Sequence, residues 1–171
     1  KTMQSCWEGQ PSTILNWFLD NRQDLVQKCV SRIPGAAGDT LALSIVDRQQ
    51  LERMLQLLVD PNEFLSNYGI RSLSRYHLDH PYVFESGNYR SEVKYVPAES
   101  DSDLFGGNSN WRGPIWMPLN YLLVESLEKF HRYYGDDFSI ECPTGSGNRM
   151  NLGQVADELA RRLGSLFLED G

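Results

Sequence analysis

The chain has 171 residues, of which 40% are hydrophobic and 23% charged, a composition ordinary for a globular domain with a core of its own. Its formal net charge is −7, because 16 scattered Lys and Arg face 23 Asp and Glu. Neutralising nucleic-acid phosphates requires clustered basic residues, so this balance argues against a nucleic-acid partner.

The cysteines and the hydropathy bear on location. Cys6, Cys29 and Cys142 are widely spaced and form no CxxC pair, which favours reduced thiols and a cytoplasmic protein without a metal or redox centre. No apolar run approaches the length of a membrane span, and no signal peptide is visible, so we expect no membrane partner. The first residue is Lys1 and the last ones follow a helical pattern directly, so we expect a piece of a longer protein.

The first elements in chain order are a helix, a loop and a second helix. Apolar spacing predicts a helix from Pro11 to about Arg22. Residues 31–40 include Pro34, Gly35 and Gly38 and are predicted to be a loop. Asp47 is a candidate N-cap for a helix that ends near Val59, before Asp60-Pro61. The apolar stripe of this helix is Leu51, Met54, Leu55 and Leu58.

A long irregular region is expected from Asn62 to Pro118, with short strands or turns such as one around 92–96. A structureless loop of that length is improbable in a compact domain unless it has a function. Pro118 then begins a helix that reaches about Tyr134, where Gly135 is the candidate C-cap. Its inward residues are predicted to be Leu119, Leu122, Leu123, Ser126, Leu127 and Phe130.

The last predicted helix begins after Asn151, and Gln154 occupies the capping-box position. Its stripe is Val155, Leu159, Leu163 and Leu166. Four helices and little strand predict a mainly α fold, with long loops at one end that would carry any site.

The segment from Gly106 to Trp116 is the strongest functional signal. It combines two indoles, Trp111 and Trp116, with the planar cation of Arg112 and the amides of Asn108 and Asn110. Sugar C–H faces stack on indole and sugar hydroxyls need donors and acceptors, so this mixture indicates a carbohydrate site. Alternatively, the indoles anchor a long loop onto the helices while Arg112 holds loop carbonyls.

An acidic run precedes this segment, with Glu99, Asp101 and Asp103 alternating with serines. Alternating oxygen ligands suit calcium, but Leu104 and Asn110 stand where a calcium loop needs Gly and Glu. The pattern better fits carboxylates that bond sugar hydroxyls or Arg112, or that lie in solvent. A catalytic pair would have to flank the bound sugar on opposite faces, which neighbouring residues of one loop seldom do.

His77 and His80 resemble a metal pair only loosely, because no third ligand lies nearby in sequence. The surrounding residues are cationic and aromatic, a composition that suits loop packing or the wall of a sugar subsite. They are Arg71, Arg75, Tyr76, Tyr82 and Phe84.

Several segments in order resemble glycoside hydrolase family 63, the processing α-glucosidases, and especially its microbial glucosidase-like members. The central match is Asn-Trp-Arg-Gly-Pro-Ile-Trp, and the resemblance is clearest from about residue 47 to residue 163. The matching segments are 62–74, 80–84, 106–116, 120–122, 134–138 and 141–147.

The resemblance implies an (α/α)6 toroid with its active site in a funnel at one end. It implies an inverting mechanism, in which a carboxylic acid protonates the leaving oxygen and a carboxylate activates water, without a metal or organic cofactor. The family's general acid lies in a motif upstream of the matched part, and its general base lies downstream of the last helix. Neither motif is found in these residues.

We therefore expect residues 1–171 to form a single partial domain of such a barrel. It would contribute substrate-site walls to an α-glucosidase acting on oligosaccharides or glucosides, and it would be inactive alone because its catalytic residues lie elsewhere. Its partners would be the substrate and the remainder of the barrel. The alternative is a non-catalytic carbohydrate-binding or structural helical module. The predicted substrate-binding residues are Trp111, Arg112, Trp116, Asn108, Asn110, Glu99 and Asp101.

Overall fold

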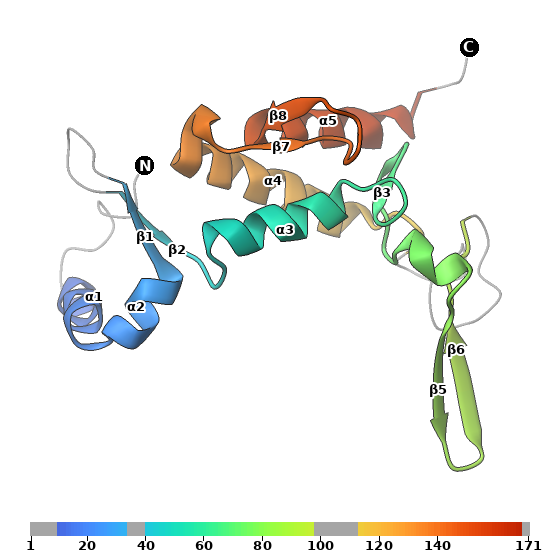
Figure 1. Cartoon of the computed structure of the whole chain (residues 1–171), viewed down its shortest axis with the longest axis horizontal. Coiled ribbons are helices and arrows are strands. Elements are labelled where there is room, and N and C mark those ends of the chain that lie inside the picture. The colour runs from blue at the N-terminus through green and yellow to red at the C-terminus, as the bar shows by residue number, and fades with distance from the viewer. Residues whose placement is uncertain (1–9, 34–39, 98–112, 169–171) are drawn as a thin grey trace. The chain divides into compact units, whose positions relative to one another are not determined.

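The computed structural model describes residues 10–33, 40–97 and 113–168. The chain divides into two compact units, residues 1–51 and residues 52–171. The elements of both units are drawn in Figure 1, and each unit is described by itself below.

The first unit contains two helices and a hairpin. Helix α1 (Gln10–Asn21) confirms the first predicted helix, whereas α2 (Gln23–Cys29) was not predicted. The expected loop at 31–40 is wrong at both ends, because strand β1 (Val30–Ile33) pairs antiparallel with β2 (Thr40–Leu43). Both strands are short runs rich in aliphatic and β-branched side chains, and such runs favour paired strands.

Helix α3 (Arg48–Leu58) begins where the sequence predicts and crosses the boundary between the units. Asp47 and Gln50 form a capping box. The Gln50 backbone N–H donates to Asp47 Oδ1 at 2.7 Å, and the Asp47 N–H donates to Gln50 Oε1 at 2.9 Å. Leu51 and Leu55 are buried as expected, but Met54 is 57% exposed, so its assignment to the inner face is wrong. Val59, one residue beyond the helix, is buried instead.

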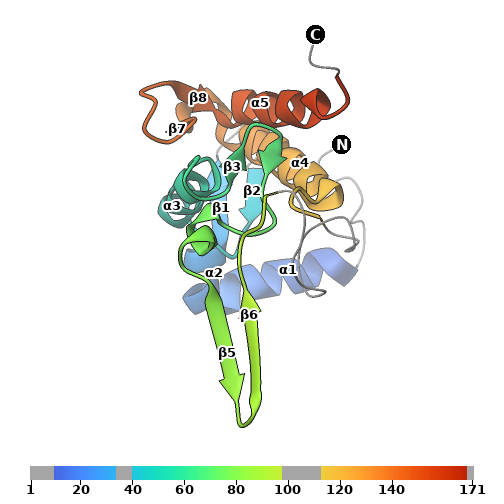
Figure 2. The same cartoon turned by 90° about the vertical axis from the view of Figure 1, so that its right-hand side faces the viewer.

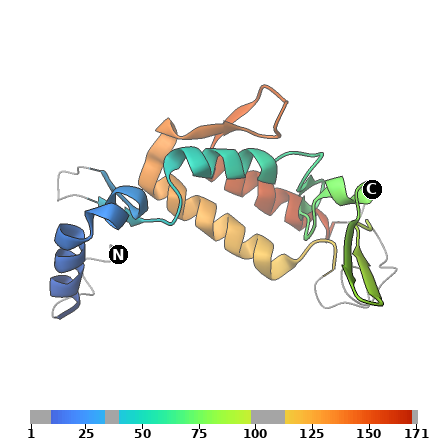
Figure 3. The ribbon, with the colours of Figure 1, turned by 60° about the horizontal axis from the view of Figure 1, so that its bottom comes forward.

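The second unit is built on α4 (Met117–Tyr134) and α5 (Leu152–Ser165), which lie side by side in Figures 1 and 3. The burial of α5 follows its predicted stripe except at Leu166, which is 43% exposed. The largest contribution of any one element to the core of this unit comes from aliphatic side chains of α5. They are Leu152, Val155, Ala156, Leu159 and Leu163, joined by Leu127 of α4.

The inward face predicted for α4 is wrong in part. Leu127 is buried, but Leu119 is 40% exposed, Leu122 is 55% exposed, and Ser126 is exposed with its hydroxyl donating to the Leu122 carbonyl. The buried residues of α4 are Asn120 and Leu127, a pair seven residues apart. Two turns of helix separate such residues, so the buried stripe is narrower than the apolar stripe of the sequence.

Three further hairpins occupy the second unit among the described residues. They are β3 (Leu65–Ser66) with β4 (Gly69–Ile70), β5 (Tyr82–Ser86) with β6 (Tyr89–Val93), and β7 (Ser139–Glu141) with β8 (Arg149–Asn151). All are antiparallel. Residues 62–97 thus contain more regular structure than expected, and the strand anticipated near 92–96 lies at Tyr89–Val93. Short 3-10 helices, η2 (Arg75–Leu78) and η3 (Gly135–Asp137), complete the unit.

The β7–β8 hairpin joins the end of α3 to the beginning of α5. Thr144 donates from its backbone N–H to the Val59 carbonyl at 3.0 Å and from its hydroxyl to the Gln56 carbonyl at 2.6 Å. Asn151 and Gln154 form the predicted capping box of α5, and Gly135 caps α4 with a φ of 65°. Helices account for about half of the described residues, and the described part of the chain holds more strand than its sequence suggested.

Candidate functional site

The segment that ends in Gly113-Pro114-Ile115-Trp116 is paired with residues 71–72. The Ser72 backbone N–H donates to the Pro114 carbonyl at 2.8 Å, and the Ser72 hydroxyl donates to the Gly113 carbonyl at 2.9 Å. Arg71 and Ile115 form an isolated antiparallel bridge. We call Arg71, Ser72, Tyr95 and residues 113–116 the loop base.

Arg71 holds the loop base together. Its Nη1 donates to the carbonyls of Pro61 and Glu63, each at 3.1 Å, and to that of Leu65. Its Nε donates to the Tyr95 hydroxyl at 3.2 Å, and its guanidinium carbon lies 5.6 Å from the centre of the Tyr95 ring. Since these donors serve the backbone and Tyr95, Arg71 has a positioning role, in which a planar five-donor group links segments that lack a common strand.

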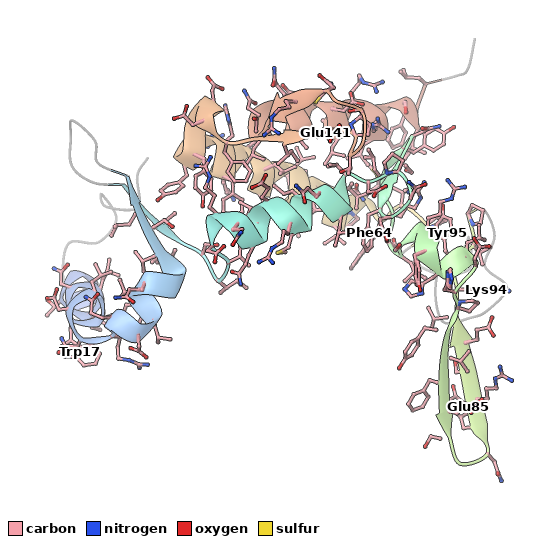
Figure 4. The ribbon with its side chains drawn as sticks, in the orientation of Figure 1. Trp17, Phe64, Glu85, Lys94, Tyr95 and Glu141 are labelled. Carbon is pink, nitrogen blue, oxygen red and sulfur yellow. The ribbon has the colours of Figure 1, made fainter. Side chains whose placement is uncertain are left out.

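Both ends of segment 96–112 are consequently attached to the same short stretch of chain. On one side Tyr95 contacts Arg71, and its N–H donates to the His77 carbonyl at 3.2 Å. On the other side Gly113 and Pro114 bond to Ser72. Figure 4 shows Tyr95 and Lys94 where the β5–β6 hairpin meets η2.

Trp116 stands at the N-cap of α4, and its side chain is half-buried. Its carbonyl accepts from the Asn120 backbone N–H at 3.1 Å and from Asn120 Nδ2 at 3.0 Å. Asn120 is buried, accepts from the Ile70 N–H at 2.7 Å and donates to the Ile70 carbonyl at 2.9 Å. Its amide thereby replaces a strand partner for β4 and fixes that strand to the start of α4.

Arg162 fixes helix α5 to the β3–β4 hairpin. Its Nη1 donates to the Ser66 carbonyl at 2.7 Å, and its Nε lies 2.7 Å from Glu158 Oε1. Glu158 also pairs with Arg161 at 2.8 Å. Hydrogen bonds from Arg161 and then Arg162 lower the pKa of Glu158 to about 2, against the opposing effect of burial.

The histidine pair is a packing feature of η2. Tyr76 and His80 stack with ring centres 4.2 Å apart, His77 Nδ1 lies 2.9 Å from the His80 carbonyl, and His80 Nδ1 lies 3.2 Å from the Tyr76 carbonyl. Within the part of the chain that the structure describes, no group of three or more His, Cys, Asp or Glu is arranged to hold a metal. The loop-packing interpretation of this segment therefore fits the contacts.

The structure places one of the seven predicted substrate-binding residues, Trp116, at the loop base. The other six lie in segment 98–112, outside the described residues, and they remain predictions. They are Glu99, Asp101, Asn108, Asn110, Trp111 and Arg112.

A shallow groove of about 390 Å³ lies elsewhere, between the last part of α4 and the first turn of α5. His131, Asn151, Gly153 and Asp157 are among its lining residues. Asn151 caps α5, and Gly153 leaves room for the His131 ring, which a Cβ would approach to 2.9 Å. Because α4 has 18 residues, this groove is roughly 25 Å from Trp116.

Sequence reasoning missed the residues that support the site. Ser72 and Tyr95 carry no motif, and Arg71 stands out only as part of a cationic and aromatic composition. The available signal was the Gly69-Ile70-Arg71 run, in which a glycine at a φ of +115° begins a short strand that ends just before the arginine. Only the fold shows that this arginine reaches three carbonyls and a tyrosine.

The model of the glycosyl hydrolase family 63 C-terminal domain matches residues 40–154. The chain belongs to glycosyl hydrolase family 63, as its motifs predict.

Three yeast proteins are similar to this chain in sequence. The uncharacterized protein YMR196W of Saccharomyces cerevisiae is 47% identical over 91% of this chain. The mannosyl-oligosaccharide glucosidase of the same organism is 25% identical over 86% of it, and the probable mannosyl-oligosaccharide glucosidase of Schizosaccharomyces pombe is 29% identical over 71%. The matches span only 14%, 15% and 12% of these relatives. Among the described helices, none combines the length and the apolar character needed to span a bilayer.

Proposed function

We propose that the chain forms part of the (α/α)6 toroid of an inverting α-glucosidase and contributes a wall of its substrate site. The observation that carries this proposal is the attachment of the Asn-Trp-Arg-Gly-Pro-Ile-Trp segment, at its Gly113–Trp116 end, to a rigid base in a family 63 chain. An oligosaccharide is the substrate class, in keeping with the names of two relatives. The protein acts in the cytoplasm.

The wall would bind sugar through two kinds of contact. Trp111 and Trp116 offer flat apolar faces for the C–H surface of a glucose ring, while Arg112, Asn108 and Asn110 offer donors and acceptors for its hydroxyls. Glu99 and Asp101 would accept hydrogen bonds from further hydroxyls. Trp116 would stand at the edge of this wall, because its backbone forms the N-cap of α4 while its side chain is half-buried.

Proton transfer is assigned to residues outside this chain. Inversion requires an acid and a base on opposite faces of the sugar, separated by enough space for water. Two carboxylates one residue apart on one segment, such as Glu99 and Asp101, do not meet that requirement. The remainder of the barrel is thus the chain's structural partner, and no metal or organic cofactor takes part.

Titration with a neutral gluco-oligosaccharide, followed by tryptophan fluorescence, tests the wall. Arg112→Ala should weaken binding about tenfold, because sugar hydroxyls lose a charged donor. Arg132→Ala is the matched control, since Arg132 is an exposed arginine near the other end of α4, and it should leave the affinity unchanged. Equal affinities for the two variants and the unmodified chain would contradict the proposal.

The second candidate is a non-catalytic carbohydrate-binding module. It is favoured by the second unit's own buried core, which holds Leu127, Ile140 and Leu159. Such a module predicts a stable monomer that binds sugar without any neighbouring barrel segment. A purely structural helical module predicts that Arg112→Ala changes stability alone. Sedimentation separates the binding module, which stays a monomer, from a barrel wall, which self-associates. The same titration separates the purely structural module, which binds no sugar, from both.

A further inference from the structure

The β5–β6 hairpin has two chemically different faces. Its register pairs Tyr82 with Val93, Phe84 with Ser91, and Ser86 with Tyr89. Side chains alternate along a strand, so these six residues share one face, which we call the aromatic face. Val83, Glu85, Arg90 and Glu92 share the other face, where Arg90 Nε lies 3.4 Å from Glu85 Oε1.

The aromatic face is open to solvent. Tyr82 and Tyr89 are each 59% exposed, and Phe84 is 49% exposed. Phe84 and Tyr89 contact each other edge to face, with ring centres 6.5 Å apart. Every residue of β5 is exposed, and Figure 2 shows the two strands extending together away from α4 and α5. Three rings gathered on one narrow ribbon and left exposed by the fold mark a candidate interaction surface.

We propose that the aromatic face is an extension subsite that stacks successive sugar rings of a neutral oligosaccharide, beyond the wall at the loop base. This inference rests on the proposed function and assigns to it a preference for long substrates. The ligand would lie along the ribbon, with its C–H faces on Phe84 and Tyr89 and its hydroxyls on neighbouring protein hydroxyls.

The chemistry of the face favours a sugar over a protein surface. Besides its rings it presents the hydroxyls of Tyr82, Ser86, Tyr89 and Ser91. Buried against an apolar protein surface, these hydroxyls would each lose a hydrogen bond with water, at a cost of about 1–3 kcal/mol per unpaired group. A sugar supplies an apolar face and hydroxyl partners together.

The lack of charge on the aromatic face also favours a neutral sugar. The acidic and basic groups of the hairpin, Glu85, Arg90 and Glu92, are confined to the opposite face, so the aromatic face is neutral at pH 7. A neutral glycan complements such a surface, whereas a charged glycan, a nucleic acid or an anionic lipid surface would find no counter-charge there.

The hairpin is also continuous with the loop base. Strand β6 ends at Val93, and Tyr95 lies two residues farther along, where it bonds to Arg71 and to the His77 carbonyl. The aromatic face therefore begins within a few residues of the support that holds Gly113–Trp116. A ligand bound at the wall would therefore find the aromatic face of the β5–β6 hairpin next to it.

Isothermal titration calorimetry of the full 171-residue chain with maltose and with maltoheptaose tests the subsite. The unmodified chain should bind maltoheptaose at least about tenfold more tightly than maltose. The double variant Phe84→Leu, Tyr89→Leu keeps apolar bulk but removes the flat rings, and it should erase that difference while the maltose affinity stays unchanged. The matched control is Val83→Ala with Glu92→Gln on the opposite face, which should keep the difference.

Equal affinities for the two sugars in the unmodified chain, or an undiminished difference in the aromatic variant, would overturn the subsite. Sedimentation of the same samples adds a further outcome. If the aromatic substitutions abolish self-association and leave sugar affinity unchanged, the face binds protein and the inference is wrong. The proposed wall fails separately, when Arg112→Ala leaves the affinity for maltose unchanged. Circular dichroism of each variant verifies that the exposed substitutions leave the fold intact.

Discussion

Gly69 and Asn120 show how single positions fix the support of the site. Gly69 has a φ of +115°, and a Cβ there would lie 2.7 Å from Leu163 Cδ2 and 2.9 Å from Asn120 Oδ1. The absence of a side chain lets β4 approach both α4 and α5, so that the Asn120 amide can bond both polar groups of Ile70. Glycine is therefore favoured at this position for two reasons: L residues rarely adopt its backbone conformation, and no space is left for a side chain.

Gly69→Ala should lower the free energy of unfolding by ~2 kcal/mol or more, because the new Cβ is both strained and crowded. Gly87→Ala is the control, since Gly87 also has a positive φ, +59°, but a Cβ added there would have no atom within 4 Å. It should cost about 1 kcal/mol. Urea denaturation followed by circular dichroism measures both. Equal costs would show that the close approach has no energetic weight.

Residue types alone did not reveal these supports. The Trp-Arg-Gly-Pro-Ile-Trp motif and the Asn151–Gln154 capping box are local signals, and the capping box was confirmed by the fold. Arg71 and Asn120 act through partners outside their own helix or strand, 24 residues away for Arg71 and Tyr95 and 50 for Asn120 and Ile70. Their partners can be known only when the chain is folded.

Helix α5 is positioned by an ion-pair cluster around Glu158. This carboxylate bonds to Arg161, whose side chain is 66% exposed, and to Arg162, whose side chain is 15% exposed and also bonds to the Ser66 carbonyl. An exposed pair contributes little, whereas a half-buried pair that also satisfies a carbonyl contributes more. The helix therefore depends on Arg162 more than on Arg161.

Arg162→Ala should destabilise the chain by ~2 kcal/mol, and Arg161→Ala should have a clearly smaller effect. The ordinary pKa of Glu158 is 4.5 and its folded value is about 2. Its ionised form therefore stabilises the fold fully above about pH 5, and this stability is lost as the pH falls toward about 2. Because the hydrogen bond from Arg161 is the largest cause of the lowered pKa, Arg161→Ala should flatten the dependence of unfolding free energy on pH between these limits. The second arginine also lowers the pKa, so the dependence should be flatter for Arg162→Ala too. An unchanged pH dependence in that variant would contradict the assigned pairing.

Periodicity predicted long helices well and short strands poorly. Helices α1, α3, α4 and α5 begin within a residue or two of their predicted starts, because Pro, Asp and Asn mark helix beginnings through local bonds. The strands of β1–β2 and β3–β4 are four and two residues long, too short for a period to be recognised. On α4 the apolar residues Leu119 and Leu122 were predicted to face inward, but they are exposed. The apolar pattern of the sequence thus includes a face of α4 that its neighbour α5 does not cover.

The exposed face of α4 belongs to the larger assembly that we propose. Leu119 and Leu122 are three residues apart and share a face, and they are 40% and 55% exposed. A helix that is apolar on more than one side is suited to contact helices on more than one side. In a toroid of paired helices such a face would be covered by another part of the barrel.

Leu119→Ser with Leu122→Ser should therefore reduce self-association of the chain, measured by sedimentation velocity, with little change in the melting of the second unit. Glu128→Ser with Arg132→Ser is the control, because it alters a polar, exposed part of the same helix. Association that persists equally in both variants would contradict a docking role for this face.

The cytoplasmic location and the single-domain description remain predictions, and the chain itself divides into two compact units.

A hydrolysis assay of the purified chain, with p-nitrophenyl α-glucoside and a gluco-oligosaccharide, tests the central claim most directly. The chain is proposed to be a wall of an α-glucosidase site whose acid and base lie outside it, so no turnover above the buffer rate is expected. Clear turnover that is abolished by Glu99→Gln or Asp101→Asn would contradict this account, because it would make the acidic segment the catalyst.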